Sequence, residues 1–284
     1  MSLSEEFTKT LYQKFKTNNE KINLIIDATL IKLLKKISGV EMYQEICDST
    51  LHGLSVANPS DLDKIFERLE IKPIVYWNPI NNQQKQYIIV SNHPTGPLEG
   101  IFIQKIFNTL GLRGKTMGDD IMSGVEQMKD AYIGLSIRVG GKSRIAQLRN
   151  IKKELLNGLS LALFPAASVS HFDLKEMKIS DYPWESGFIE MAKSNNLDIL
   201  PVYIDANLSI LHYIFKEVYE DISSLRLFRE SKIFIDKNKG KTLELYIGQP
   251  ISSKELESTS ECAKKVQEIC ENLMFQSYTN IESK

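Results

Sequence analysis

Short apolar runs bounded by glycine, proline and asparagine recur along the chain and predict strands. The predicted strands cover residues 74–77, 87–90, 135–139, 160–164, 198–204, 232–235 and 243–247. Between several of them, apolar residues repeat at helical spacing. The predicted helices cover residues 99–111, 143–157, 184–195 and 221–230, and a last helix covers 261–275. This alternation predicts an α/β fold.

The first part of the chain has a different pattern, which predicts mostly helix up to about residue 70. Asn58 and the three residues after it form a turn and cap before a helix at 62–69. We therefore expect a helical N-terminal subdomain over 1–70 and an α/β domain over 71–284. Residues 21–37 combine one apolar side with several lysines. This pattern fits either a core helix, which we favour, or a helix that contacts a membrane surface.

A polar break follows the strand predicted at 87–90, where residues 91–100 read Ser-Asn-His-Pro-Thr-Gly-Pro-Leu-Glu-Gly. In α/β sheets ligands bind at the carboxyl ends of the strands, and His93 is expected there. Glu99 would lie in the first turn of the next helix, where a carboxylate can fix the tautomer of the imidazole and raise its basicity. We predict that His93 is a catalytic base and that Glu99 is its partner.

Composition narrows the class of protein. The chain has 284 residues, of which 42% are hydrophobic and 25% charged, and its net charge is -1. Acidic and basic residues are interspersed, which argues against a nucleic-acid binder. Three cysteines form no metal or redox motif and fit a reducing compartment. No apolar stretch is long enough to span a membrane and no signal peptide is recognisable, so we expect a cytoplasmic protein.

The 91–100 segment resembles the first block of the glycerolipid acyltransferases, in which an Asn-His pair is followed by an aspartate. It is most similar to the hemolysin and ornithine-lipid acyltransferase branch, whose sequence is Asn-His-Pro-Leu-Gly-Gly-Leu-Asp-Gly. On this pattern Glu99 stands where the family has its aspartate. The resemblance implies a mixed sheet flanked by helices.

Other blocks follow in the family's order. Residues 161–170 resemble the third block of the hemolysin branch, Phe-Pro-Ala-Gly-Glu-Val-Ser, except that Ala167 replaces its Gly and Ser168 its Glu. Residues 199–204 resemble the fourth block, and residues 134–138 resemble the second block weakly. The resemblance implies a set of substrate-binding residues: Asn92, Thr95, Gly96, Arg138, Phe164, Pro165, Ser168 and Ser170. Further basic candidates for acceptor contacts are Lys115, Lys142 and Arg144.

The implied activity is transfer of a fatty acyl group from acyl carrier protein or coenzyme A to the hydroxyl of a lysolipid. The acceptor would be a lysophospholipid or an amino-acid-derived lysolipid. No metal and no cofactor beyond the acyl thioester is expected. The protein would then be cytoplasmic, with peripheral contact at the inner membrane face left open. Two alternatives also stay open: an acyltransferase with a soluble biosynthetic acceptor, and a non-catalytic relic that binds acyl groups or a partner.

The expected mechanism follows from thioester chemistry. An alcohol attacks a thioester slowly because it must lose its proton, and a positioned imidazole accelerates such a step by ~10²–10⁴-fold. His93 would remove the proton, and backbone N–H groups near Gly96 would stabilise the oxyanion. Neither Ser91 nor Ser170 lies in a Gly-x-Ser-x-Gly elbow, which favours direct transfer over a serine nucleophile.

Overall fold

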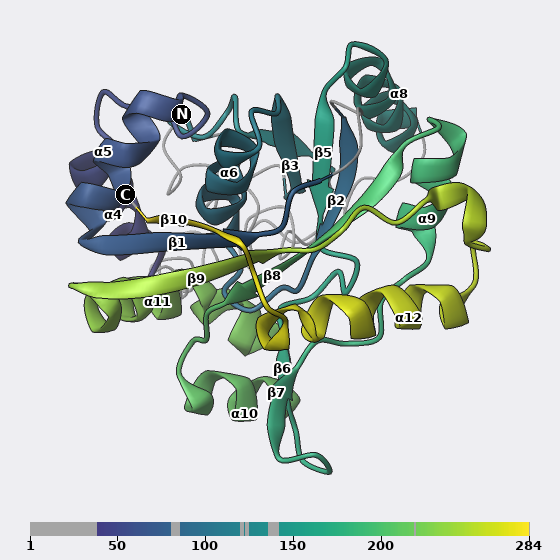
Figure 1. Ribbon diagram of the computed structural model, residues 1–284. Coiled ribbons are helices and arrows are strands. Elements are labelled where there is room, and N and C mark those ends of the chain that lie inside the picture. The colour runs from purple at the N-terminus through teal and green to yellow at the C-terminus, as the bar shows by residue number, and fades with distance from the viewer. Residues whose placement is uncertain are drawn as a thin grey trace, which may run out of the picture.

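The structure is a computed structural model that describes residues 39–80, 86–119, 122, 125–135, 142–218 and 220–283 (Figure 1). The strands of its large sheet are β1 (Ile71–Trp77), β2 (Tyr87–Ser91), β3 (Gly114–Gly118), β4 (Tyr132–Gly134), β5 (Ser160–Leu163), β8 (Asp198–Asp205), β9 (Lys241–Ile247) and β10 (Asn280–Ser283). In space their order is β10-β1-β9-β8-β2-β5-β3-β4. A separate hairpin consists of β6 (His171–Asp173) and β7 (Lys178–Ser180).

Helices pack on both faces of this sheet. They are α4 (Val40–Thr50), α5 (Pro59–Leu69), α6 (Glu99–Thr109), α8 (Lys142–Leu156), α9 (Gly187–Ser194), α10 (Ile210–Val218), α11 (Glu220–Asn238) and α12 (Ser260–Glu271), with short 3-10 turns at Ser253–Glu255 and Leu273–Phe275. In Figure 1, α4 and α5 lie at the left and α8, α9 and α12 at the right. The predicted α/β fold with a mixed sheet flanked by helices is confirmed.

The direction of the strands determines where loops meet. β8, β2, β5, β3 and β4 all run parallel, whereas β9 is antiparallel to β8. Val90 pairs with Leu163 of β5 on one side and with Pro201 of β8 on the other. The segments that follow β2 and β5 therefore emerge at the same carboxyl edge of the sheet.

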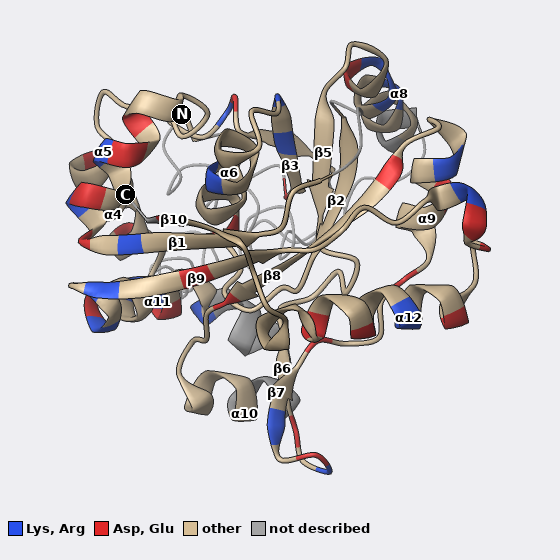
Figure 2. Ribbon diagram, in the orientation of Figure 1, with Lys and Arg blue, Asp and Glu red and all other residues tan. Residues whose placement is uncertain are grey.

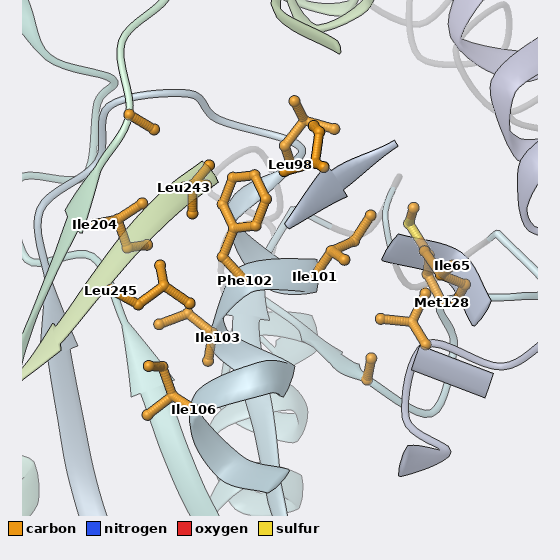
Figure 3. Close-up of a cluster of buried hydrophobic side chains, with 14 of the residues drawn as sticks. Ile65, Leu98, Ile101, Phe102, Ile103, Ile106, Met128, Ile204, Leu243 and Leu245 are labelled. Atoms are coloured by element: carbon orange, nitrogen blue, oxygen red, sulfur yellow. The ribbon is translucent and has the colours of Figure 1, made fainter. Parts of the chain in front are cut away.

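Two hydrophobic cores cover the two faces of the sheet, and β2 contributes to both. Ile88 and Val90 belong to the core beneath α8, α9 and α12, whereas Tyr87 and Ile89 face the core that includes α4, α5 and α6. Figure 3 shows the second core where α6 lies over β8 and β9. Its labelled residues include Phe102, Ile103 and Ile106 of α6, which lie beside Ile204, Leu243 and Leu245. Each fully buried side chain of this kind contributes roughly 1.5–3 kcal/mol, so the sheet holds α6 firmly.

The start of α5 confirms the predicted cap. The Asn58 side-chain oxygen accepts hydrogen bonds from the N–H groups of Ser60 at 3.0 Å and Asp61 at 3.4 Å. Pro59 stands at the first helical position, where its missing N–H costs nothing. The helix then runs to Leu69 as expected.

Two strand predictions are wrong in whole or in part. Residues 232–235, predicted as a strand, lie within α11. Phe228, Ser231 and Phe234 of this helix are all buried, which is a helical repeat. Of the strand predicted at 135–139, Leu135 is not in a strand and lies directly after β4, which ends at Gly134. Residues 136–139 are outside the described part of the chain.

Of the predicted N-terminal subdomain, the structure describes α4 and α5. α5 packs on β1 and α6, and α4 packs on α11. Both helices contribute to the same core as the sheet. Residues 21–37 lie outside the described residues, and a division at residue 70 stays a prediction.

The outer surface carries both signs of charge. Figure 2 shows basic and acidic residues interspersed on α12. Where the chain is described, none of its helices combines the length and the apolar character needed to cross a bilayer.

Candidate active site

The loop after β2 is attached to the neighbouring strand by a side chain. The Asn92 amide donates to the carbonyl oxygen of Ile204 at 2.9 Å and accepts from the N–H of Ile204 at 2.8 Å. The asparagine thereby continues the β2–β8 pairing by one residue beyond the strand. Because both ends of its amide bind backbone, we interpret Asn92 as a residue that fixes the loop, and its predicted contact with substrate stays a prediction.

His93 and Glu99 are in direct contact, as the sequence predicts. Glu99 Oε2 lies within hydrogen-bond distance of His93 Nδ1. The Glu99 side chain is 0% exposed and the His93 side chain 18% exposed. An ionised carboxylate only accepts hydrogen bonds, so Nδ1 is the donor and Nε2 carries the lone pair of the ring. In this tautomer Nε2 can accept a proton, as a general base must.

The second oxygen of Glu99 is bound by its own loop. The N–H groups of Thr95 and Gly96 donate to Glu99 Oε1, the latter at 2.7 Å. Gly96 adopts a positive φ of 71°, and a Cβ there would lie 2.6 Å from Leu227 Cδ2. These two N–H groups bind a carboxylate in this structure, and Thr95 and Gly96 thereby orient Glu99. The use of the Gly96 amide for an oxyanion stays a prediction.

Tyrosine hydroxyls hold the remainder of the loop. Tyr213 donates to the Pro94 carbonyl at 2.7 Å, and Tyr43 and Tyr132 both lie 3.3 Å from the Pro97 carbonyl. Burial raises the pKa of all three hydroxyls above the usual value, so they stay protonated donors. The prolines lack N–H groups, and these contacts satisfy their carbonyl groups in a buried setting.

The third block meets this loop from β5. The ring of Phe164 stacks on the imidazole of His93, with centroids 4.6 Å apart and planes 9° apart. The Pro165 carbonyl accepts a hydrogen bond from the N–H of Glu185 at 3.1 Å. Ala167 has a φ of 56°, the left-handed conformation in which the hemolysin branch has glycine. The block thus places one apolar wall of the site against His93.

Ser170 connects the third block to His93 through its backbone. Its N–H donates to the His93 carbonyl at 2.8 Å, and its hydroxyl donates to Asp181 Oδ1 at 2.5 Å. Asp181 also accepts from the backbone N–H of His93 and, at 3.1 Å, from the Trp184 indole. Burial raises the Asp181 pKa, while these hydrogen bonds and the charge of His93 oppose the rise.

The other predicted residues do not join this cluster through any contact seen here. Ser168 is half-buried in the loop after β5, and Lys115 is half-buried on β3. Arg138 lies outside the described residues. Lys142 and Arg144 begin α8, but their side chains are not among the described ones.

Asp181 and the three tyrosines that bind the loop were not predicted from the sequence. Each reaches the loop from a distant part of the chain, and none belongs to a motif around His93. Asp181 precedes a Tyr-Pro-Trp segment, which by itself signals only a turn.

A cavity elsewhere in the protein and possible metal-ligand clusters were the other candidates for a functional site. A cavity of about 250 Å³ between α5 and α6, lined by residues such as Leu62 and Phe107, includes neither His93 nor Glu99. In the described ranges, no three His, Cys, Asp or Glu residues converge as metal ligands would.

The fold and the site together define an α/β protein with a histidine–carboxylate pair on a loop at the carboxyl edge of its sheet. A family model described as acyltransferase matches residues 79–279, well over half of the chain. The chain therefore belongs to this acyltransferase family, and it is an acyltransferase. The predicted membership among the acyltransferases is confirmed, while the hemolysin and ornithine-lipid branch stays a prediction.

Among solved structures, the chain is similar to the 1-acyl-sn-glycerophosphate (LPA) acyltransferase PlsC from Thermotoga maritima. The two share 15% sequence identity with a TM-score of 0.49, and the match covers 98% of this chain and 97% of the other. A search of curated proteins finds no match.

Proposed function

We propose that this acyltransferase moves a fatty acyl group from a thioester of acyl carrier protein or coenzyme A to the hydroxyl of a lysolipid. His93 is the general base, and Glu99 orients it. The lysolipid class rests on the order of the sequence blocks, which resembles that of the glycerolipid acyltransferases. Fatty acyl chains are insoluble in water, so the protein would work at a membrane surface or take its donor from a carrier protein.

The observation that carries this proposal is the double attachment of Glu99. One carboxylate oxygen contacts His93 Nδ1, and the other accepts the N–H groups of Thr95 and Gly96. The carboxylate is fully buried, so its charge is poorly screened by solvent. It therefore fixes the tautomer of His93 and stabilises the imidazolium that forms when the ring takes a proton.

The reaction then needs one proton relay. His93 Nε2 takes the proton of the acceptor hydroxyl as the hydroxyl oxygen bonds to the thioester carbonyl carbon. The tetrahedral intermediate collapses, the carbon–sulfur bond breaks, and the imidazolium returns the proton to the departing thiolate. The products are the acylated lipid and a free thiol, and His93 ends as it began.

The half-buried ring of Phe164 supports this scheme on one side. It stacks on the imidazole and leaves less water around it. A drier environment strengthens the attraction between Glu99 and a protonated His93. Phe164 would thereby help both to orient the ring and to exclude water from the thioester.

A direct assay tests the proposal. Purified protein is incubated with palmitoyl thioesters of acyl carrier protein and of coenzyme A, each with lysophosphatidic acid, a lyso-ornithine lipid or a water-soluble alcohol. We expect turnover with a lysolipid, and a loss of ~10²–10⁴-fold in His93→Ala. Asp236→Asn, which alters an exposed pair with Lys232 on α11, should leave the rate unchanged.

Two results would contradict the proposal. Equal turnover by wild type and His93→Ala would exclude His93 as the base. Turnover with the soluble alcohol alone would replace the lysolipid by a soluble acceptor while keeping the chemistry.

A further inference from the structure

Asp181 lies outside every block that resembles the acyltransferases, yet its carboxylate accepts a hydrogen bond from the backbone N–H of His93. It follows β7 directly and is only 9% exposed. Both of its oxygens lie 3.1 Å from the His93 N–H, and the Ser170 hydroxyl and the Trp184 indole are its other donors. The carboxylate thus joins three separate segments of the chain at one point.

These hydrogen bonds hold both the backbone N–H and the backbone carbonyl of His93. Asp181 binds its N–H, and Ser170 binds its carbonyl through a backbone N–H at 2.8 Å. The Ser170 hydroxyl donates to Asp181, so His93, Ser170 and Asp181 form a closed cycle of hydrogen bonds. The position of the imidazole relative to Glu99 therefore depends on Asp181, which accepts the backbone N–H of His93.

Asp181 also adds charge near the imidazole. Its hydrogen-bond donors, the His93 N–H, the Ser170 hydroxyl and the Trp184 indole, are neutral groups, and among the described residues no lysine or arginine pairs with it. A buried carboxylate in this situation is costly unless a positive charge forms nearby. His93 can supply one, and its charge acts favourably on Asp181.

The other titratable groups around this point stay neutral when His93 titrates. Burial raises the pKa of the Tyr203 and Tyr213 hydroxyls and of the Cys270 thiol, all of which interact with Asp181. Burial likewise raises the pKa of Tyr132, which faces Glu99. Among these described groups, the carboxyl groups of Glu99 and Asp181 are the ones whose negative charge would stabilise the imidazolium.

We propose that Asp181 is a second carboxylate of the active site, a positioning residue that holds His93 by its backbone N–H and stabilises its imidazolium. The proposal rests on the proposed role of His93 as the base. Asp181 touches neither acceptor nor donor, and its effect reaches the reaction through His93 alone.

The test compares two variants that differ in the charge at residue 181 and in one acceptor oxygen, without the indole donor that an Asn NH₂ group would face. Replacing Asp181 by Asn puts an NH₂ group against the Trp184 indole N–H or another donor, which disturbs geometry as well as charge. Trp184→Phe removes the indole donor and keeps the carboxylate, and Asp181→Asn in the Trp184→Phe background then removes the charge. NMR titration of His93 in both proteins, together with kcat and KM against pH, gives the readouts.

We expect the double variant to lower the His93 pKa by roughly half a unit or more relative to Trp184→Phe. The acidic limb of the pH profile should shift by the same amount, and kcat should fall roughly 10-fold or more with little change in KM. An unchanged His93 pKa with an unchanged kcat would overturn the proposal and leave Asp181 as a structural residue.

A measurement on the wild type keeps the proposal testable if the double variant does not fold. Asp181 must be ionised over the pH range in which His93 titrates, which NMR of labelled aspartate carboxyl groups can establish. A protonated Asp181 in that range would overturn the proposal. A His93 pKa that depends on Asp181 in a protein without acyl transfer would support the coupling and count only against the proposed function.

Discussion

Glu99 carries one methylene more than the aspartate of the family pattern, and the extra length is used. Its carboxylate spans from the N–H groups of Thr95 and Gly96 to the ring of His93. An aspartate at the same backbone position would be about 1.5 Å shorter and could not keep both contacts. The loop and the longer acid therefore fit each other, and restoring the family residue alone should harm the enzyme.

The expected result for Glu99→Asp is a fall in kcat/KM of roughly 10- to 100-fold, since a misplacement of about 1 Å at a reacting group can cost that much. The kcat/KM of Glu99→Gln should fall at least as far, because this change removes the charge and its NH₂ group can favour the other tautomer of His93. Steady-state kinetics would measure kcat/KM of both variants, with His93→Ala as the reference for activity without the base. Wild-type activity in Glu99→Asp would show that the acid does not orient the base.

Ala167 gives a second residue-level prediction. Its φ of 56° is unfavourable for a residue with a Cβ, and the side chain is exposed, so a glycine there would lose no packing. Ala167→Gly should raise the free energy of unfolding by ~0.5–1 kcal/mol, after the entropy of the unfolded glycine is counted. Urea denaturation of the two proteins measures the difference, and a loss of stability would contradict this account of the turn.

At the scale of elements, the unit formed by β2, its loop and α6 could be predicted, because its determinants are contiguous. A β-branched run, a polar break and a carboxylate six residues after His93 fix the strand, the loop and the contact. The strand prediction at 232–235 failed because its apolar run of three residues, 233–235, fits a strand and a helix equally well. Asp181 and Tyr213 could not be predicted, since tertiary packing alone brings them to the loop.

The first turn of α6 depends on a glycine. A Cβ on Gly100 would lie 1.8 Å from the Tyr132 hydroxyl oxygen, so Gly100→Ala must displace a side chain that binds the Pro97 carbonyl. We expect a loss of about 1–3 kcal/mol in unfolding free energy, together with lower activity. Gly187→Ala is the matched control at the start of α9, where a Cβ meets nothing within 4 Å. Thermal and urea unfolding that affected both variants equally would contradict the steric explanation.

At the scale of the whole molecule, a buried lysine ties the end of the described chain to the helix that carries Glu99. Lys105 of α6 is 1% exposed, and its ammonium group lies 3.0 Å from Glu282 of β10 and 3.9 Å from Asp63 of α5. Glu282 is 28% exposed, so solvent weakens its contribution in part. The ammonium group of Lys105 is nevertheless buried away from water, so its charge is compensated mainly by the carboxylate of Glu282 in β10.

Glu282→Gln should therefore destabilise the protein by about 1–3 kcal/mol, because it leaves a buried cation short of a partner. Lys105→Met in the Glu282→Gln background should recover most of that loss, since an unbranched apolar side chain of similar length fills the same space without a charge. Unfolding free energies of the two single variants and the double variant form a double-mutant cycle. A sum of single effects with no recovery in the double variant would mean that β10 is attached to the body by its backbone pairing with β1 and not by this ion pair.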